Sequence, residues 1–311
     1  TEDNCPPMPP TLVAVAVGFV VLYQKFYRGY EAAPERERGL RRRILEYSVP
    51  LTATRGAGVL DKQVDTILVG FFLTPTAVGF YTIAKQVSEV CTTPAQALGF
   101  TVSPAYGEQQ MGAQSDRAAR LYEQSLEGVL LLYVPAVVGL VLVAEPMVRH
   151  VFGSEYLGAV PVLQVMSLYV LASAINRITS DGLDFLGRAR ARAIVKSATA
   201  IANVLLNIAL IPAIGVVGAA IATVITYSIY TGANVVLIGR ELPIRLGTAV
   251  RTTIGVATVS VVMGACVYLM LPHVSGVLSL SAVVAIGVAV WAILGSLGGI
   301  LDLREAIEFL S

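Results

Sequence analysis

The sequence predicts an all-α protein that crosses a membrane several times. Three observations support this: its composition, the length of its apolar runs, and the position of the basic residues between them. Of the 311 residues, 55% are hydrophobic and 14% are charged, and the mean hydropathy is +0.72. Soluble globular proteins carry about 25% charged residues, so this composition is typical of a membrane protein.

The apolar runs supply the expected elements, because a transmembrane helix needs about 20 mostly apolar residues. Full-length runs cover residues 44–73, 77–105, 118–144, 156–185, 193–211, 216–239, 252–271 and 279–300. A shorter run at 12–23 follows a Pro-rich start and lacks the basic segment of a signal peptide. We interpret residues 1–23 as the end of a truncated transmembrane helix, in a chain that is the carboxy-terminal portion of a longer protein.

The basic residues predict the orientation of these helices. If residues 24–43 lie in the cytoplasm and the spans alternate from there, most of the 22 Lys and Arg residues fall in inner loops. Only Arg149 falls in an outer loop, and the four others lie inside spans. This satisfies the positive-inside rule and predicts a cytoplasmic carboxy terminus in the cell membrane. The net charge of +1 gives no indication of nucleic-acid binding.

The segments divide the chain into parts. Residues 24–43 are the one long, highly charged connection, which we expect to be a cytoplasmic linker between two lobes. Residues 44–239 hold six spans, and the last two must form an antiparallel hairpin because only the turn 212–217 joins them. Residues 240–311 hold an extra pair of helices without charged residues, followed by a short amphipathic tail.

Charged residues inside the spans indicate a polar interior, since a charge at mid-membrane costs at least ~2.5–3.5 kcal/mol. Arg55, Asp61, Lys62 and Asp65 share one face of the span 44–73. Lys85 and Glu89 are four residues apart in the next span, the spacing of a helical ion pair. An intrahelical ion pair of structural use, or residues near the outer surface, is the alternative explanation for the first set.

Three further spans each have one polar face. The faces carry Ser173, Arg177, Ser180, Asp181 and Asp184 on 156–185; Lys196, Thr199, Asn203 and Asn207 on 193–211; and Thr223, Tyr227, Tyr230 and Asn234 on 216–239. One polar face per helix predicts a shared hydrophilic cavity. Alternatively, such side chains hold helices together by hydrogen bonds, which we favour for Asn203 and Asn207 taken individually.

Signals for enzymatic chemistry are few. The two histidines, His150 and His273, lie at the outer ends of spans, and the sequence has no HExxH, GxGxxG, phosphate-loop or paired-cysteine motif. The outer loops are short, whereas a sugar-lipid polymerase or ligase would need a large one. The sequence therefore predicts a transporter and not an enzyme, without a cofactor or a metal site.

Three segments carry a family resemblance. Residues 64–84, VDTILVGFFLTPTAVGFYTIA, place an acidic residue before a short turn and a VGxYxxA run. Residues 210–223, LIPAIGVVGAAIAT, form an IP..G..GAA.AT hairpin, and residues 151–168, VFGSEYLGAVPVLQVMSL, follow a G..Y..A...L.I pattern. In order and spacing these segments resemble the polysaccharide or O-antigen flippase (Wzx-like) branch of the multidrug/oligosaccharidyl-lipid/polysaccharide (MOP) exporter superfamily, over roughly residues 44–240.

The resemblance implies a MATE/MOP-like helical bundle of two six-helix lobes that works by alternating access. Residues 44–239 would form the second lobe and residues 240–311 the extra helix pair, and the first, amino-terminal lobe would be missing from this chain. The implied activity is a flippase that moves a lipid-linked oligosaccharide across the cytoplasmic membrane for surface polysaccharide or glycan assembly. Membrane lipid and a coupling ion, H⁺ or Na⁺, are the other implied partners, and no nucleic acid is implied.

The expected site residues form two sets. Arg55, Lys62, Lys85, Arg177, Asn203 and Tyr227 would bind substrate in the cavity, and Asp61, Asp65 and Glu89 would couple an ion or balance charge. Within the first set, Arg55 and Arg177 would contact the pyrophosphate head group. Two alternatives remain open: a cation-coupled multidrug antiporter of the same fold, and a non-transporting membrane scaffold of a glycan-assembly complex.

Overall fold

The computed structural model describes residues 18, 20–27, 63–108, 115–244 and 246–298. The chain divides into two compact units, Thr1–Val59 and Leu60–Ser311. In the first unit the described residues are helical and end in a π-helical turn, Tyr23–Tyr27. Arg55, Asp61, Lys62 and most of the charged segment 24–43 lie outside the described residues.

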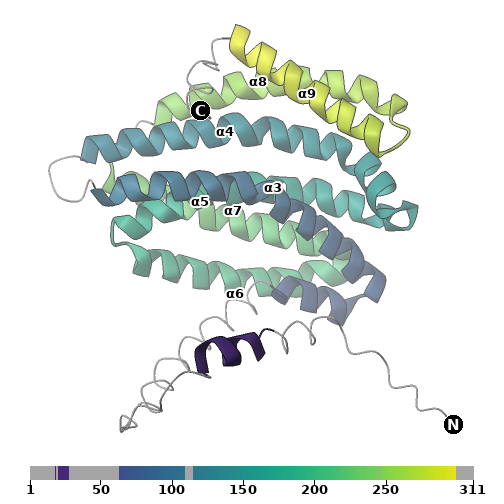
Figure 1. Cartoon of the computed structure of the whole chain (residues 1–311), viewed down its shortest axis with the longest axis horizontal. Helices are drawn as coiled ribbons and strands as arrows, with labels where there is room; N and C mark the ends of the chain where they lie inside the picture. Colours follow the sequence, from purple (N-terminus) through teal and green to yellow (C-terminus); the bar gives the residue numbers. More distant parts are fainter. Residues whose placement is uncertain (1–17, 19, 28–62, 109–114, 245, 299–311) are drawn as a thin grey trace. The chain divides into compact units, whose positions relative to one another are not determined.

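The second unit is a bundle of long helices (Figure 1). It begins with the helix Gln63–Phe72 and continues with α3 (Pro75–Glu108), α4 (Ser115–Met147), α5 (Val160–Phe185), α6 (Ala189–Ile214), α7 (Val216–Glu241), α8 (Leu246–Met270) and α9 (Val277–Leu297). Short turns η3 (Val148–Phe152) and η4 (Ser154–Ala159) connect α4 to α5, and η5 (Leu271–His273) connects α8 to α9. The part of the chain that the structure describes contains no β-strand, and the predicted all-α fold is confirmed.

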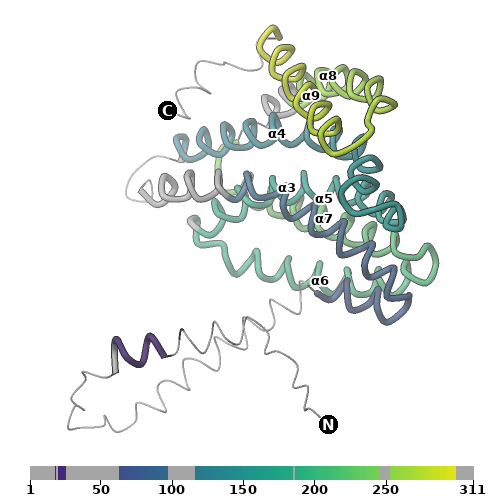
Figure 2. Tube along the Cα trace, turned by 45° about the vertical axis from the view of Figure 1, so that its right-hand side comes forward, coloured from purple at the N-terminus to yellow at the C-terminus, as the bar shows by residue number. Residues whose placement is uncertain are grey.

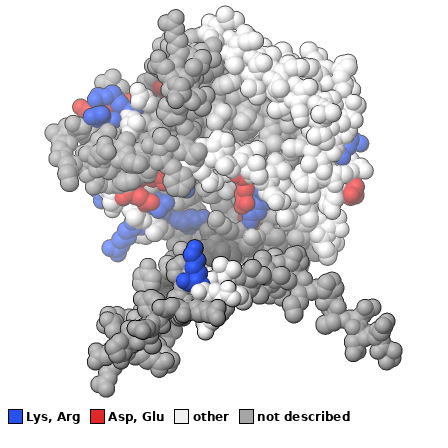
Figure 3. All heavy atoms as spheres, viewed as in Figure 1, with Lys and Arg blue, Asp and Glu red and all other residues white. Residues whose placement is uncertain are grey.

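The bundle has the surface of a membrane protein. Within the described residues, six segments are long and apolar enough to cross a membrane: Asp116–Phe152, Ser154–Asp184, Ala189–Ile214, Val216–Glu241, Thr253–His273 and Val277–Leu297. Large apolar side chains point outward, as Ile201 and Leu205 of α6 do, each more than 60% exposed. Among the described residues on the face seen in Figure 3, charged side chains form a few separate groups.

Helix α3 differs from these six segments. It is 34 residues long but is not among the apolar candidates, because polar residues such as Lys85 and Glu89 interrupt its apolar sequence. Its predicted passage through the membrane stays a prediction. The remaining helices suffice to make the chain a multi-pass membrane protein.

Helix α5 is the centre of the packing, since it contacts α3, α4 and α7 along its length. Helix α6 packs on α7, α8 packs on α4, and α9 packs on α8, so the extra pair lies beside α4 (Figures 1 and 2). The core between these helices includes Leu163, Met166 and Ile178 of α5, all at most 2% exposed. The order of the helices therefore brings the polar faces of α5 and α7 toward each other.

The hairpin predicted from the turn 212–217 is present. Helix α6 ends at Ile214 and α7 begins at Val216, and Gly215 between them has a φ of +68°, a region that side chains with a Cβ rarely adopt. Gly218 faces the backbone carbonyl of Leu210, and a Cβ at this position would collide with that oxygen. The two glycines of the 210–223 motif are thus needed for different reasons: Gly215 for its positive φ, and Gly218 for the close approach of the Leu210 carbonyl.

One buried tyrosine bridges two backbone groups of α3. The hydroxyl of Tyr133, on α4, accepts a hydrogen bond from the N–H of Ala95 at 2.8 Å and donates to the carbonyl of Cys91 at 3.1 Å. These two groups are four residues apart, so they are partners in a regular α-helix. Side chains inserted at such a position are a known cause of helix bending, and Pro94 next to Ala95 adds a second one.

Candidate functional site

The first polar site of the bundle surrounds Asp65, and we call Asp65, Tyr81, Asn203, Asn207 and Thr223 the Asp65 cluster. Tyr81 donates its hydroxyl to Asp65 Oδ2 at 3.0 Å, and Thr223 Oγ1 lies 3.0 Å from the same oxygen. Asn207 donates from Nδ2 to Asp65 Oδ1 at 2.8 Å. The carboxylate thus has donors from three helices, α3, α6 and α7.

Three members of the Asp65 cluster lie at a common depth. Asp65 is seven residues before Phe72, Asn207 seven before Ile214, and Thr223 seven after Val216. At 1.5 Å per residue each group is about 10 Å from its helix end, and their contacts mean that both hairpin turns lie at the same end of the bundle. In a hydrocarbon layer of ~30 Å, this depth is well inside the membrane.

Hydrogen bonds continue from the carboxylate into α6 and α7. Asn207 also donates to the side-chain oxygen of Asn203 at 3.0 Å, and Asn203 donates to Thr226 at 3.2 Å. Asn207 is fully buried, and its own Oδ1 has no hydrogen-bond donor within the described residues. The cluster therefore presents several oxygens, from a carboxylate, amides and a hydroxyl, close to one another.

The second polar site is a cavity of about 470 Å³ between α3, α5, α6 and α7, which we call the polar cavity. Helix α5 supplies most of its wall through Ser173, Asn176, Arg177, Ser180, Asp181 and Asp184. Thr92 and Gln96 of α3, Arg192 of α6 and Tyr227 of α7 complete the polar lining. The polar face predicted for residues 156–185 therefore does face a cavity.

The charged groups of the polar cavity are arranged in pairs. Arg177 Nε lies 3.5 Å from Asp181 Oδ2, one helical turn along α5. Arg192 Nη2 lies 2.7 Å from Asp184 Oδ2 and joins the start of α6 to the end of α5. Two cations and two anions line the described wall, so its formal charge is zero.

The position of Tyr227 is fixed by neighbours on three sides. Its ring meets Tyr169 edge-on at a centroid distance of 4.8 Å and Tyr230 at 5.8 Å. Its hydroxyl accepts a hydrogen bond from Asn176 Nδ2 at 3.2 Å. The amine of Lys196 lies 6.0 Å from the ring centroid, within the range of a cation–π contact.

Behind the cavity wall, Asn176 also joins α5 to the far part of α7. Its side-chain oxygen accepts hydrogen bonds from Asn234 at 2.9 Å and from Ser180 at 3.3 Å. Asn234 is fully buried. Amide pairs of this kind hold transmembrane helices together, which is the structural alternative already considered for such residues.

The structure brings four of the predicted site residues into these two sites. Asp65 and Asn203 belong to the Asp65 cluster, and Arg177 and Tyr227 line the polar cavity. Lys85, half-buried, and Glu89, exposed, lie on α3 and are not among the residues that line the polar cavity. Binding or coupling by any of these residues stays a prediction.

Three members of the Asp65 cluster were not among the predicted site residues. Asn207 and Thr223 had been noted on polar helix faces, and Tyr81 is the tyrosine of the VGxYxxA run. Tyr81 is 0% exposed although its hydroxyl is polar, and a buried Tyr hydroxyl normally needs a partner. An acidic residue one hairpin away, Asp65, was the available signal.

Known proteins with similar sequences include proteins of polysaccharide and glycan biosynthesis. A family model described as "Polysaccharide biosynthesis protein" matches residues 10–161. The probable low-salt glycan biosynthesis flippase Agl15 of Haloferax volcanii is 26% identical over 190 residues, which are 61% of this chain and 40% of that protein. The probable flippase AglR of the same organism is 27% identical over 168 residues, 53% of this chain and 35% of that protein.

A solved structure of a MOP superfamily transporter from Pyrococcus furiosus is also similar, with a TM-score of 0.46 and 16% identity. The match covers 82% of this chain and 61% of that one. The chain spans about two fifths of the length of the two curated relatives named above. The chain is thus similar to polysaccharide biosynthesis proteins over residues 10–161 and to probable flippases over 53–61% of its length.

Proposed function

We propose that the full-length protein is a flippase that moves a lipid-linked oligosaccharide across the cytoplasmic membrane for surface polysaccharide or glycan assembly. The observation that carries this proposal is a polar cavity of about 470 Å³ inside a bundle whose outer surface is apolar. A sugar head group cannot cross hydrocarbon unaided because its hydroxyl groups would lose their hydrogen bonds to water. Polar groups within the bundle replace those bonds while the lipid stays in the membrane.

The proposed transport proceeds by alternating access. The polar cavity extends from Tyr227, near the middle of α7, to Asp184 and Arg192 at the turn between α5 and α6. The Asp65 cluster occupies the other half of the bundle. The amino-terminal lobe expected from the family resemblance would supply the opposite wall of a central cavity, and movement of the two lobes would expose it to each side in turn.

In this proposal Asp65 couples transport to H⁺ or Na⁺. Oxygen atoms are the ligands that hard cations prefer. Asp65, Asn207 and Thr223 supply them at one depth, and Asn203 supplies another one helical turn deeper. A proton or a cation at the carboxylate would change which of its neighbours can donate hydrogen bonds to it. The cluster joins three helices, so this change would alter their packing.

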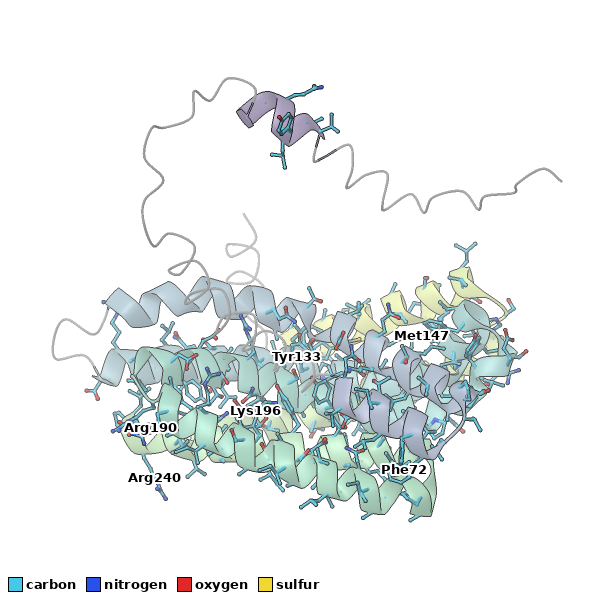
Figure 4. All side chains as sticks on the ribbon, turned by 90° about the horizontal axis from the view of Figure 1, so that it is seen from below. Phe72, Tyr133, Met147, Arg190, Lys196 and Arg240 are labelled. Carbon is cyan, nitrogen blue, oxygen red and sulfur yellow. The ribbon has the colours of Figure 1, made fainter. Side chains whose placement is uncertain are left out.

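The orientation follows from the basic end of the bundle. Arg190 and Arg240 lie together at one end in Figure 4, whereas Phe72 and Met147 lie toward the other. Cytoplasmic loops carry the excess of basic residues, so we propose that the Arg190 end and the carboxy terminus are cytoplasmic. A carboxy-terminal fusion to a reporter that is active only in the cytoplasm tests this assignment.

We propose transport without covalent chemistry. His150 lies in η3 and His273 in η5, both at helix ends, and neither lines the polar cavity. The charged side chains of the polar cavity form ion pairs and Asp65 is hydrogen-bonded to three side chains, an arrangement that suits reversible binding more than nucleophilic attack.

The deciding experiment is disruption of the full-length gene, followed by analysis of surface glycan and of lipid-linked oligosaccharide inside the cell. Loss of surface glycan together with accumulated lipid-linked sugar supports the proposed flippase. Complementation with Asp65→Asn should restore little export, whereas Glu145→Gln, which changes an exposed carboxylate paired with Arg149, should restore it fully. Normal glycan combined with altered sensitivity to cationic drugs would instead assign the protein to drug export.

A further inference from the structure

We propose that the polar cavity is a saccharide subsite that takes an uncharged sugar residue of the cargo, and that it does not bind the pyrophosphate. The inference rests on the proposed flippase function and specifies which part of the cargo this cavity recognises. It assigns Arg177 and Tyr227 to sugar recognition, in place of the head-group contact expected for Arg177 from the sequence.

The first argument is charge. A pyrophosphate is a multiple anion and requires a surplus of positive charge close to it. In the polar cavity each arginine already has a carboxylate partner: Arg177 has Asp181, and Arg192 has Asp184. Asp181 and Asp184 also line the cavity, so a pyrophosphate placed there would meet two carboxylates.

The second argument is hydrogen bonding. A sugar hydroxyl both donates and accepts, so its site needs donors and acceptors side by side. The guanidinium groups of Arg177 and Arg192 donate, the carboxylates accept, and the amide of Gln96 does both. The cavity offers this mixture in a space whose volume falls within the ~300–1,000 Å³ of small-molecule sites.

The third argument is the aromatic wall. Tyr227 lines the cavity and is held by Tyr169, Tyr230 and a hydrogen bond from Asn176. A ring fixed in this way provides a flat apolar surface for the C–H face of a sugar at little cost in conformational entropy. Lys196 contacts the rings of Tyr227 and Tyr230 and is not one of the lining residues.

The test measures binding to the purified full-length protein in lipid nanodiscs by saturation-transfer NMR. The probes are the methyl α-glycosides of glucose, mannose and galactose, and inorganic pyrophosphate is the competitor. We expect saturation transfer to the ring protons of at least one glycoside, and pyrophosphate should not displace it.

Variants locate the binding. Tyr227→Ala should weaken glycoside binding about tenfold, because it removes an aromatic surface and a hydrogen-bonding hydroxyl. Tyr227→Phe keeps the ring and its packing and should weaken binding less, which separates recognition from misfolding. Tyr268→Ala changes an exposed tyrosine of α8 that is 64% exposed and should leave binding unchanged.

The charge argument has its own variants. Arg177→Gln leaves Asp181 unpaired and should weaken glycoside binding, while the double variant Arg177→Gln/Asp181→Asn should recover most of it. A pyrophosphate site would respond differently to these variants. Asp181→Asn would tighten pyrophosphate binding, and the double variant would abolish it.

Absence of saturation transfer from all three glycosides overturns the inference, as does an unchanged signal in Tyr227→Ala. Pyrophosphate binding that tightens in Asp181→Asn and is lost in the double variant assigns the cavity to the head group. These results are independent of the gene disruption: lost export without sugar binding leaves the flippase proposal intact, and sugar binding with normal export rejects the flippase proposal alone.

Discussion

Replacing Tyr81 by Phe tests whether the Asp65 cluster stabilises the bundle. The change removes one hydroxyl and leaves the ring, so it creates almost no cavity. Tyr81 is 0% exposed, and its hydroxyl donates to Asp65 Oδ2 at 3.0 Å. Asp65 keeps its contacts with Asn207 and Thr223, so the carboxylate loses one of three hydrogen bonds.

The magnitude follows from the kind of bond that is lost. Hydrogen bonds to charged groups contribute about 1.5–3 kcal/mol in proteins, whereas bonds within membrane proteins average ~0.6 kcal/mol and reach ~1.7. The hydrogen bond of Tyr81 is made to a carboxylate and lies inside a membrane protein, so its contribution should fall between these two ranges. We expect Tyr81→Phe to lower the free energy of unfolding by about 1–2 kcal/mol. Thr223 cannot replace the lost donor, because its hydroxyl already lies 3.0 Å from the same oxygen.

The assay is reversible unfolding of the full-length protein in mixed micelles, with Tyr268→Phe as the control. Tyr268 is 64% exposed on α8, and the loss of its hydroxyl should change the free energy of unfolding by less than about 0.5 kcal/mol. The double variant with Asp65→Asn should lose less than the sum of the two single variants, because both changes act on the same hydrogen bond. Equal stabilities of Tyr81→Phe and Tyr268→Phe would show that the bond contributes nothing.

Three further predictions use the same unfolding assay. Gly218→Ala should destabilise the α6–α7 hairpin by about 1–3 kcal/mol, because the new Cβ meets a backbone carbonyl. Gly232→Ala, on the same helix with open space around it, should not destabilise it. Equal free energies of unfolding for the two variants would contradict the close approach at Gly218. Tyr133→Phe should lower the free energy of unfolding by about 1–2 kcal/mol, because it removes the hydroxyl that bridges Ala95 and Cys91 of α3. Amide hydrogen exchange in this part of α3 should accelerate. Unchanged protection would mean that Ala95 and Cys91 bond each other directly in the variant. Arg188→Ala should change stability by at most ~1 kcal/mol, because its ion pair with Glu241 is partly exposed; a larger loss would mean that this pair fixes the α5–α6 turn.

The sequence predicted the helices and their polar faces because both depend on local pattern. The run 193–211 lies inside α6, and the short turn after it forced the hairpin with α7. The i,i+4 spacing of Arg177 and Asp181 makes their ion pair a local feature as well. Such features need no knowledge of which helix lies opposite.

The partners of Asp65 could not be predicted in this way. Asn207 and Thr223 are more than a hundred residues away in the chain, and periodicity states which face of a helix is polar without stating what it meets. The bridge from Tyr133 to α3 could not be predicted for the same reason, because it depends on which turn of α3 packs against α4. A periodic pattern also cannot show that the charges of a polar face neutralise one another across two helices, as Arg192 and Asp184 do.

Helix α7 contacts both polar sites. Thr223 reaches Asp65, and Tyr227, one turn further along, lines the polar cavity and bonds Asn176. Asn234, about two turns beyond Tyr227, bonds the same asparagine. Because an α-helix transmits a displacement along its axis with little internal change, a proton or cation that alters the hydrogen bonds of Asp65 would act on the cavity through α7. Under the proposed function, α7 therefore couples the two halves of the bundle. Helix α5 carries Asn176, the partner of both Tyr227 and Asn234, and α7 would move against it.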